Sequence, residues 1–156
     1  MRTSSDLHNF LQSKGIDHEI CLVEHAPRTG RRAAALLGVD EGEVAKTVIA
    51  VADGVPIALL VPADKMADFS KISALIGAKD LRMAEPAEVV AFTDYVLGAT
   101  PPFGHAKEMR TIVDPSVVSA TLVYCGGGEP NAILKIRPED VVAVSGAVVA
   151  DISKVG

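Results

Sequence analysis

The feature that most constrains the fold is the segment "VAKTVIAVADGVPIALLVPAD" at residues 44–64. It contains two runs of β-branched and aliphatic residues, separated by the dipeptide Asp53-Gly54. Asp-Gly between two such runs predicts a tight β-hairpin, because both central turn positions need residues that tolerate positive φ. Pro56 indicates that the second strand is irregular, or lies at a sheet edge, where it begins. We therefore expect a pair of antiparallel strands in this part of the chain.

Helical and extended segments are interspersed on both sides of this hairpin. Apolar spacing, cap residues and glycine stops predict helices over 3–15, 28–39, 69–80, 85–94 and 137–144. Alternating or β-rich runs predict strands over 17–23, 111–113, 120–125 and 132–136, and an extended segment near 147–152. Because no regular βα period is present, we predict one α+β domain over residues 1–156, with a mixed sheet flanked by helices.

The first two helices carry more specific expectations. Ser4 or Ser5 is expected to cap the first helix, and Thr29 the second. Gly38 is expected to end the second helix. The core-facing residues of that helix are expected to be Ala33, Leu36 and Leu37.

The composition limits the function classes. The chain carries 15 Lys and Arg against 20 Asp and Glu, a formal net charge of −5. This balance argues against non-specific coating of nucleic acid, but it permits a local basic pocket for one RNA end. No apolar run is long enough for a membrane helix, and the first residues have no apolar signal-peptide core. Cys21 and Cys125 form no CxxC motif, so we expect reduced thiols, no metal site and a cytoplasmic location.

Several familiar catalytic motifs are missing. The chain has no G-x-S-x-G, no H-E-x-x-H, no dense Cys/His cluster and no Walker loop. The segment "GGGEPN" at 126–131 lacks the helix context of a dinucleotide fingerprint. We therefore expect no cofactor.

A glycine- and proline-rich loop, "LGATPPFGH" at residues 97–105, remains as a candidate site, together with Lys46 at the start of the hairpin. Glycine lets main chain approach a substrate closely, and proline stiffens the loop. The loop is either a tight connection that serves the fold alone or a stiff clamp that presents backbone N–H groups to a substrate.

Four segments occur in a fixed order: the hairpin of residues 44–64, "LGATPPFG", "TIVDPSVV" and "LVYCGGGEPNAILKIRPEDVVA". With this set the chain resembles the YbaK and prolyl-tRNA-synthetase editing-domain family of aminoacyl-tRNA deacylases over about residues 17–152. The resemblance implies the fold of that family, in which a mostly antiparallel, barrel-like sheet is flanked by helices. It also implies a free-standing, trans-acting enzyme that hydrolyses the ester between a wrong amino acid and the 3′-terminal adenosine of a tRNA.

The resemblance further implies the substrates, partners and functional residues. The amino acid would be small, such as Cys, Ala or Pro, on tRNA-Pro or a related tRNA. The partners would be the acceptor end of the mischarged tRNA and an aminoacyl-tRNA synthetase. The functional lysine falls on Lys46, and the remaining motif positions fall on Gly98, Pro102, Gly104, Asp114, Gly126 and Gly127.

Physical chemistry leaves alternatives open at several of these positions. Lys46 either orients the substrate or anchors a phosphate, since a lysine acts as a point charge. Thr47 lies on the opposite face of a regular strand and fits packing better than substrate contact. His105 either touches substrate or is an exposed loop histidine, Asp114 fits a turn or cap, and Cys125 fits a buried thiol. The basic residues that we test for RNA contacts are Arg28, Arg31, Arg32, Lys71, Lys107 and Arg110.

Two functions of different classes therefore compete. One is the deacylase, and the other is a non-catalytic module that binds an aminoacyl-tRNA or a synthetase. A third reading, in which the proline-rich loop is a peptide ligand for an aromatic groove, is disfavoured because "TPPFG" is short and flanked by core-forming segments.

Overall fold

The central hairpin forms as the sequence predicts, in a computed structural model that describes all 156 residues. Strands β2 (Ala45–Ala52) and β3 (Val55–Pro62) pair along their whole length. Asp53 and Gly54 both have positive φ, of 48° and 81°. Pro56 pairs with Val51, but β3 acquires its second neighbour only from Ile57 onward, so the proline lies where the strand still has an open edge.

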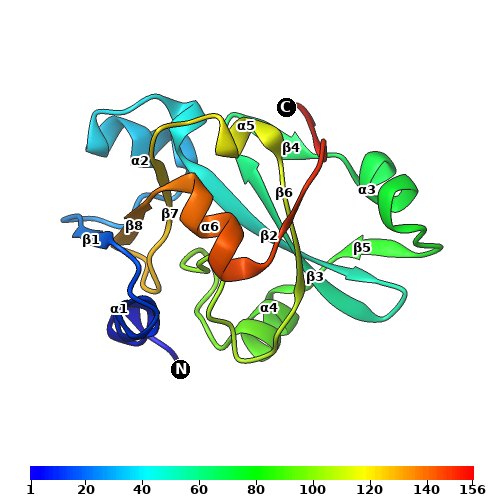
Figure 1. Ribbon diagram of the computed structural model, residues 1–156, viewed down its shortest axis with the longest axis horizontal. Helices are drawn as coiled ribbons and strands as arrows, with labels where there is room; N and C mark the ends of the chain where they lie inside the picture. The colour runs from blue at the N-terminus through cyan, green and yellow to red at the C-terminus, as the bar shows by residue number, and fades with distance from the viewer.

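Eight further strands and six α-helices surround this hairpin (Figure 1). The helices are α1 (Ser4–Ser13), α2 (Gly30–Leu37), α3 (Phe69–Ile76), α4 (Pro86–Thr93), α5 (Pro115–Val118) and α6 (Pro138–Ser145), with a 3-10 turn η1 (Glu41–Glu43). The other strands are β1 (His18–Leu22), β4 (Lys65–Ala67), β5 (Leu81–Met83), β6 (Arg110–Val113), β7 (Val123–Gly126), β8 (Ala132–Ile136), β9 (Val148–Val149) and β10 (Ser153–Val155).

The strands form one large sheet and two smaller ones. The five-stranded sheet has the order β5-β2-β3-β6-β9, the three-stranded sheet β1-β8-β7, and β10 pairs with β4. The pairs β3–β6 and β6–β9 are parallel, and the other pairs are antiparallel. A single parallel bridge between Val44 and Tyr124 connects the two larger sheets. The mixed α+β class is thus confirmed, although the strands do not close into a barrel.

Alternation along β2 and β3 gives the large sheet two apolar faces. Ala50, Leu59 and Val61 pack with Ile72 of α3 on one face. Ile49, Val51 and Ala58 pack with Val89 of α4 on the other. A third cluster joins Leu7 and Leu11 of α1 to the three-stranded sheet and α6. These layers fix β2 between α3 and α4, as Figure 1 shows.

Several expectations need correction. The N-cap of α1 is Thr3, which forms a capping box with Asp6, rather than Ser4 or Ser5. Thr29 caps α2 and Gly38 ends it in the left-handed region, as expected. Ala33 and Ala34 are the buried residues of this helix, while Leu36 is 44% exposed, because α2 contacts Val44, Tyr124 and Ile133 along one narrow stripe.

Other differences concern short elements. The strand expected over 120–125 begins only at Val123, because the chain first leaves α5 through a turn. The sequence reasoning did not anticipate η1, β4, β5 or α5. No helix combines the length and apolarity that crossing a membrane requires.

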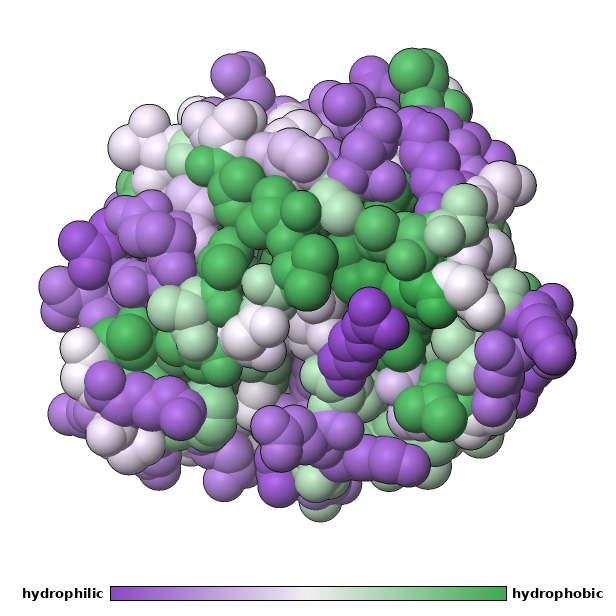
Figure 2. Space-filling model, turned by 45° about the vertical axis from the view of Figure 1, so that its right-hand side comes forward, coloured by the Kyte–Doolittle hydropathy of each residue, from purple (hydrophilic) through white to green (hydrophobic).

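The surface is not uniformly polar. Figure 2 shows hydrophobic residues gathered in the middle of the face that it presents, with hydrophilic residues mostly around its margins. Both residues of the edge strand β9 are exposed valines, Val148 and Val149.

Candidate active site

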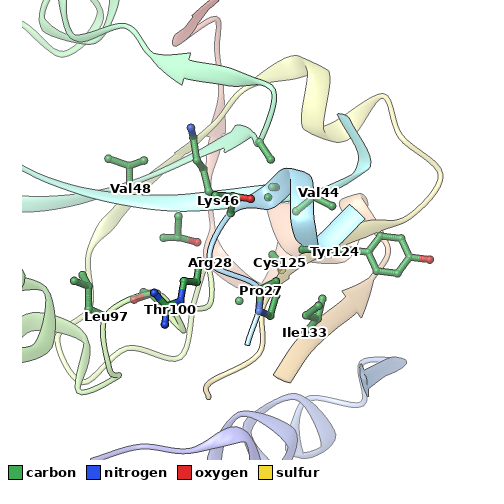
Figure 3. A pocket seen from close by; sticks show the side chains of 18 of the residues that line it. Pro27, Arg28, Val44, Lys46, Val48, Leu97, Thr100, Tyr124, Cys125 and Ile133 are labelled. Atoms are coloured by element: carbon green, nitrogen blue, oxygen red, sulfur yellow. The ribbon is translucent and has the colours of Figure 1, made fainter. Parts of the chain in front are cut away.

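A cavity of about 570 Å³ opens beside the first half of β2 (Figure 3). Most of its lining comes from four parts of the chain: residues 27–33 at the start of α2, residues 44–49 at the start of β2, the β5–α4 region with the loop after α4, and the β7–β8 hairpin. In Figure 3, β2 runs along one side of the cavity and carries Lys46 and Val48, Leu97 and Thr100 lie across from it, and Tyr124 and Ile133 lie at one end. Segments distant in sequence therefore meet at one hollow.

Lys46 and Thr47 are consecutive residues of β2, and both line the cavity. Lys46 is exposed, and Figure 3 shows its amino group pointing away from Arg28. Thr47 is partly buried, and its hydroxyl oxygen is inaccessible and has no hydrogen-bond partner. A buried hydroxyl without a partner costs about 1–3 kcal/mol, which a bound group that pairs with it can recover.

The glycine- and proline-rich loop contributes its first half to the cavity. Gly98, with φ of 85°, and Thr100 line it. Pro102 is buried outside the lining, and Gly104, with φ of 71°, packs on the ring of Phe10. The second half of the loop thus anchors the first half to the body of the protein.

Two further contacts hold this loop. Arg2 Nη1 donates a hydrogen bond of 2.6 Å to the carbonyl of Gly104. His105 Nε2 donates to the carbonyl of Pro101 at 2.6 Å. Burial lowers the pKa of His105, so the neutral ring is favoured there. His105 does not line the cavity, and its contacts are with the loop itself.

The glycine turn supports the loop from below. A Cβ at Gly126 would lie 2.2 Å from the carbonyl oxygen of Thr100, so β7 and the loop approach more closely than any side chain permits. Gly126 also lines the cavity. Gly127 does not, and it packs against the backbone of Ala132. Sequence reasoning grouped these glycines as one turn, but they meet different neighbours.

Asp114 lies away from the cavity, at the end of β6. Its carboxylate caps α5 by accepting from Ser116 N at 3.1 Å and joins the C-terminal segment by accepting from Ile152 N at 3.1 Å. Burial raises the pKa of Asp114, but these hydrogen bonds outweigh burial and leave its pKa below the ordinary value. Its position fits the cap that the sequence suggested.

The cavity mouth carries an excess of positive charge. Arg28, Arg31 and Lys46 line it with one carboxylate, that of Glu41. None of the three cations forms an ion pair within the chain. In a protein with a formal net charge of −5, this local excess favours an anionic ligand.

The other basic candidates lie outside the cavity. Lys71 pairs with Asp151 at 3.1 Å, and Lys107 lies over the ring of Phe92. Arg32 is exposed on α2, and Arg110 is exposed at the start of β6.

Sequence reasoning missed part of the wall. Met83 and Val89 line the cavity but belong to no motif that it singled out as chemistry, and Leu97 and Thr100 line it from within the glycine- and proline-rich loop without having been named as site residues. Their proximity depends on how β5, α4 and the following loop fold back on β2, for which the local sequence carries no signal. Cys125, expected as a buried thiol, is buried and also lines the cavity, and burial raises its pKa to about 12.

The sequence of this chain is similar to those of known proteins. The model of the aminoacyl-tRNA editing domain family matches residues 24–144. The proline–tRNA ligase of Geobacter sp. is 32% identical over 129 residues, which are 80% of this chain and 22% of that protein. The chain therefore spans about a fifth of the length of that ligase. The multifunctional Ser/Thr-tRNA deacylase ProXp-y of Escherichia coli is 27% identical over 117 residues, 72% of this chain and 70% of that protein.

The similarity extends to solved structures. A protein assigned as a trans-editing enzyme for prolyl-tRNA synthetase superposes with a TM-score of 0.91 at 27% identity. The superposition covers 97% of this chain and 96% of that one. Since the family model covers most of the chain and includes every wall of the cavity, this protein belongs to the aminoacyl-tRNA editing domain family.

Proposed function

We propose that this protein is a free-standing deacylase that hydrolyses the ester between a wrongly attached amino acid and the 3′-terminal adenosine of a tRNA. The observation that carries the proposal is one cavity that joins a cationic mouth to the Gly98–Thr100 backbone and Lys46, in a chain of the editing-domain family. The near-complete overlap with a protein assigned as a trans-editing enzyme supports the free-standing form.

The cavity offers what this reaction requires. A phosphate of the RNA end binds at Arg28 and Arg31, and the amino group of Lys46, which points away from Arg28, contacts a different part of the RNA end; none of the three cations has an acid partner within the chain. The aminoacyl group then extends along β2 toward the loop, where backbone N–H groups stabilise the negative charge that develops on the carbonyl oxygen of the ester. Water attacks the carbonyl carbon, the bond to the ribose oxygen breaks, and that oxygen takes a proton as the amino acid leaves.

The roles of the remaining candidates follow from their positions. Gly98 lets the loop backbone come close to the substrate, and Gly126, which has no Cβ, lets the backbone of Thr100 pack directly on β7. Pro102, Gly104 and His105 fix the loop from outside the cavity. Cys125 stays a neutral thiol, so we assign it to the wall rather than to nucleophilic attack.

The substrate is a small amino acid such as Cys, Ala or Pro, because the same cavity must also accommodate the terminal adenosine. The relatives named as proline–tRNA ligases favour tRNA-Pro or a related tRNA, and a synthetase as a partner in the cytoplasm, where tRNAs are charged. The alternative function, a non-catalytic module that holds an aminoacyl-tRNA, would use the same cavity without cleavage.

A panel of tRNAs mischarged with different amino acids tests the proposal. Wild-type protein is expected to release at least one small amino acid much faster than buffer does, and Lys46→Ala is expected to fold normally and to release it more slowly. Protection of every ester against hydrolysis would instead establish the binding module. Full activity of Lys46→Ala would remove Lys46 from the mechanism but would leave the deacylase in place.

A further inference from the structure

At one position of β2, both the N–H and the C=O lack a hydrogen-bond partner within the chain. On the side opposite β3, strand β5 pairs with β2 only at residues 50–52. One more hydrogen bond follows, from Ala84 N to the carbonyl of Ile49 at 3.0 Å. At the other end, just before β2 begins, Val44 forms the bridge with Tyr124 of β7. Between these two contacts lies Thr47.

Strand geometry decides where the backbone of Thr47 points. The N–H and C=O of one residue in a strand face the same edge, and successive residues alternate between edges. Ile49 and Asp53 bond toward the β5 side, through Ala84 and through Asp80 at 2.8 Å. Thr47 has the same parity, so its N–H and C=O also face that side, and no residue of the chain pairs with them there.

The cavity occupies this open edge. Met83, Ala84, Val89 and Leu97 line it on the β5 side, and residues 44–49 line it on the β2 side. Figure 3 shows the open part of β2 along the hollow, with Leu97 and Thr100 opposite. A strand normally pairs its backbone groups, so an unpaired N–H and C=O that face a cavity indicate a ligand that supplies the missing partners.

An aminoacyl ester has the partners that this opening lacks. Its carbonyl oxygen accepts one hydrogen bond, and its α-ammonium donates another from the adjacent carbon, in the order found in a peptide strand. We propose that the aminoacyl group docks on β2 as a strand of one residue, with its carbonyl oxygen bound to Thr47 N–H and its α-ammonium bound to the carbonyl of Thr47. This inference rests on the proposed function and adds a main-chain recognition element to it.

The docking has two consequences. The N–H of Thr47 becomes a donor for the developing oxyanion, opposite the backbone of the loop at Gly98 and Thr100. The α-ammonium contributes a charge-assisted hydrogen bond, which is stronger than a neutral one. Because both contacts use the main chain of Thr47, every substrate must have a free α-amino group. The cavity walls then distinguish substrates by their amino-acid side chains.

Two substitutions at Thr47 separate main chain from side chain. Thr47→Val removes the hydroxyl and keeps the N–H. Thr47→Pro removes both, and because this N–H lies outside the β2–β3 ladder, the strand is expected to tolerate proline as edge strands do. We expect Thr47→Pro to have a kcat roughly 100-fold or more below that of Thr47→Val, with the KM for tRNA little changed. Equal kcat values in two folded variants would overturn the proposal.

A substrate-side experiment decides the matter if Thr47→Pro does not fold. Wild-type protein is given tRNA esterified with alanine or with propionic acid, which lacks only the α-ammonium. The acceleration over spontaneous hydrolysis is expected to be about tenfold or more larger for the alanyl ester. Equal acceleration of both esters would contradict the docking.

Failure of the proposed function gives a different result. If the wild type hydrolyses no aminoacyl-tRNA, the non-hydrolysable amides 3′-alanylamino- and 3′-propionylamino-3′-deoxyadenosine are titrated into it. Tighter binding of the alanyl compound, lost on addition of an N-acetyl group, would support docking in a protein that does not cleave. Equal binding of the two amides would reject docking as well.

Discussion

Replacing Gly126 by alanine tests whether deacylation requires the close approach between β7 and the backbone of the loop at Ala99 and Thr100. A Cβ there would lie 2.2 Å from the carbonyl oxygen of Thr100, 2.7 Å from its carbon and 3.0 Å from the carbonyl oxygen of Ala99. All three atoms are backbone, so no side-chain rotation relieves the contact. Since ordinary contact begins at about 3.4 Å, the Thr100 peptide must move by about 1 Å.

That displacement has a calculable effect. The loop cannot move freely, because Gly128 N donates to the carbonyl of Ala99 at 2.9 Å and two buried prolines follow Thr100. Overpacking of this kind costs roughly 1–3 kcal/mol of stability. A shift of about 1 Å in groups that position a substrate can lower the rate by about 100-fold. We therefore expect Gly126→Ala to lose about 100-fold in kcat and to melt at a lower temperature than wild type.

Gly77→Ala is the matched control. Gly77 ends α3 with φ of 68° and has nothing within 4 Å of a new Cβ, so its substitution costs about 1–2 kcal/mol through backbone strain alone. Both variants are assayed for deacylation at a temperature well below their melting points, and by thermal melting. If Gly126→Ala kept the kcat of wild type, or if both variants lost kcat equally, the position of the loop relative to β7 would not control the rate.

Three further predictions concern charge and titration. Because burial raises the pKa of Cys125 to about 12, iodoacetamide at pH 8 is expected to alkylate the other cysteine and to spare Cys125 until the protein is denatured, as mass spectrometry can determine. The pKa of Asp114 is lowered in the folded protein, so its carboxylate stabilises the fold fully above its pKa in the unfolded chain, about 4, and this stabilisation is lost as the pH falls through its folded pKa. In melting experiments, Asp114→Asn should therefore weaken the decrease of melting temperature at acid pH. Replacing Arg28 and Arg31 together by glutamine should reduce the slope of log KM against log salt by about 1–2, whereas Arg110→Gln should leave it unchanged.

Local sequence signals predicted the hairpin but did not predict which strands pair with it. Asp53-Gly54 specifies a turn whose geometry depends on those two residues, and the turn forms as expected. The parallel pairing of β3 with β6 joins residues about fifty positions apart, and nothing in either strand specifies that partner. The missed short strand β5 has the same cause, since three residues carry little periodicity of their own.

For the candidate site, too, local sequence predicted some features, whereas others depend on distant segments. Alternation along a regular strand predicts the side chain of Thr47 on the face opposite Lys46, and sequence reasoning therefore expected packing there; in the structure Thr47 lines the cavity. The partnerless hydroxyl and the unpaired backbone of Thr47 depend on where β5 stops, more than thirty residues later. A residue's own sequence context specifies which face it occupies, but the rest of the chain determines whether that face is covered.

The open edge of β2 in turn has an identifiable local cause. Glu85 is the extended N-cap of α4 and precedes Pro86, which disfavours the helical region for Glu85 and starts the helix at the next residue. The chain therefore turns away from β2 directly after the hydrogen bond of Ala84, before β5 can reach Thr47. Unpaired edges usually invite aggregation and are shortened or covered. Here the opening spans only the short stretch between the bridge at Val44 and the hydrogen bond of Ala84 and lies beside a cavity, so it excludes a second protein strand while it admits a single aminoacyl group.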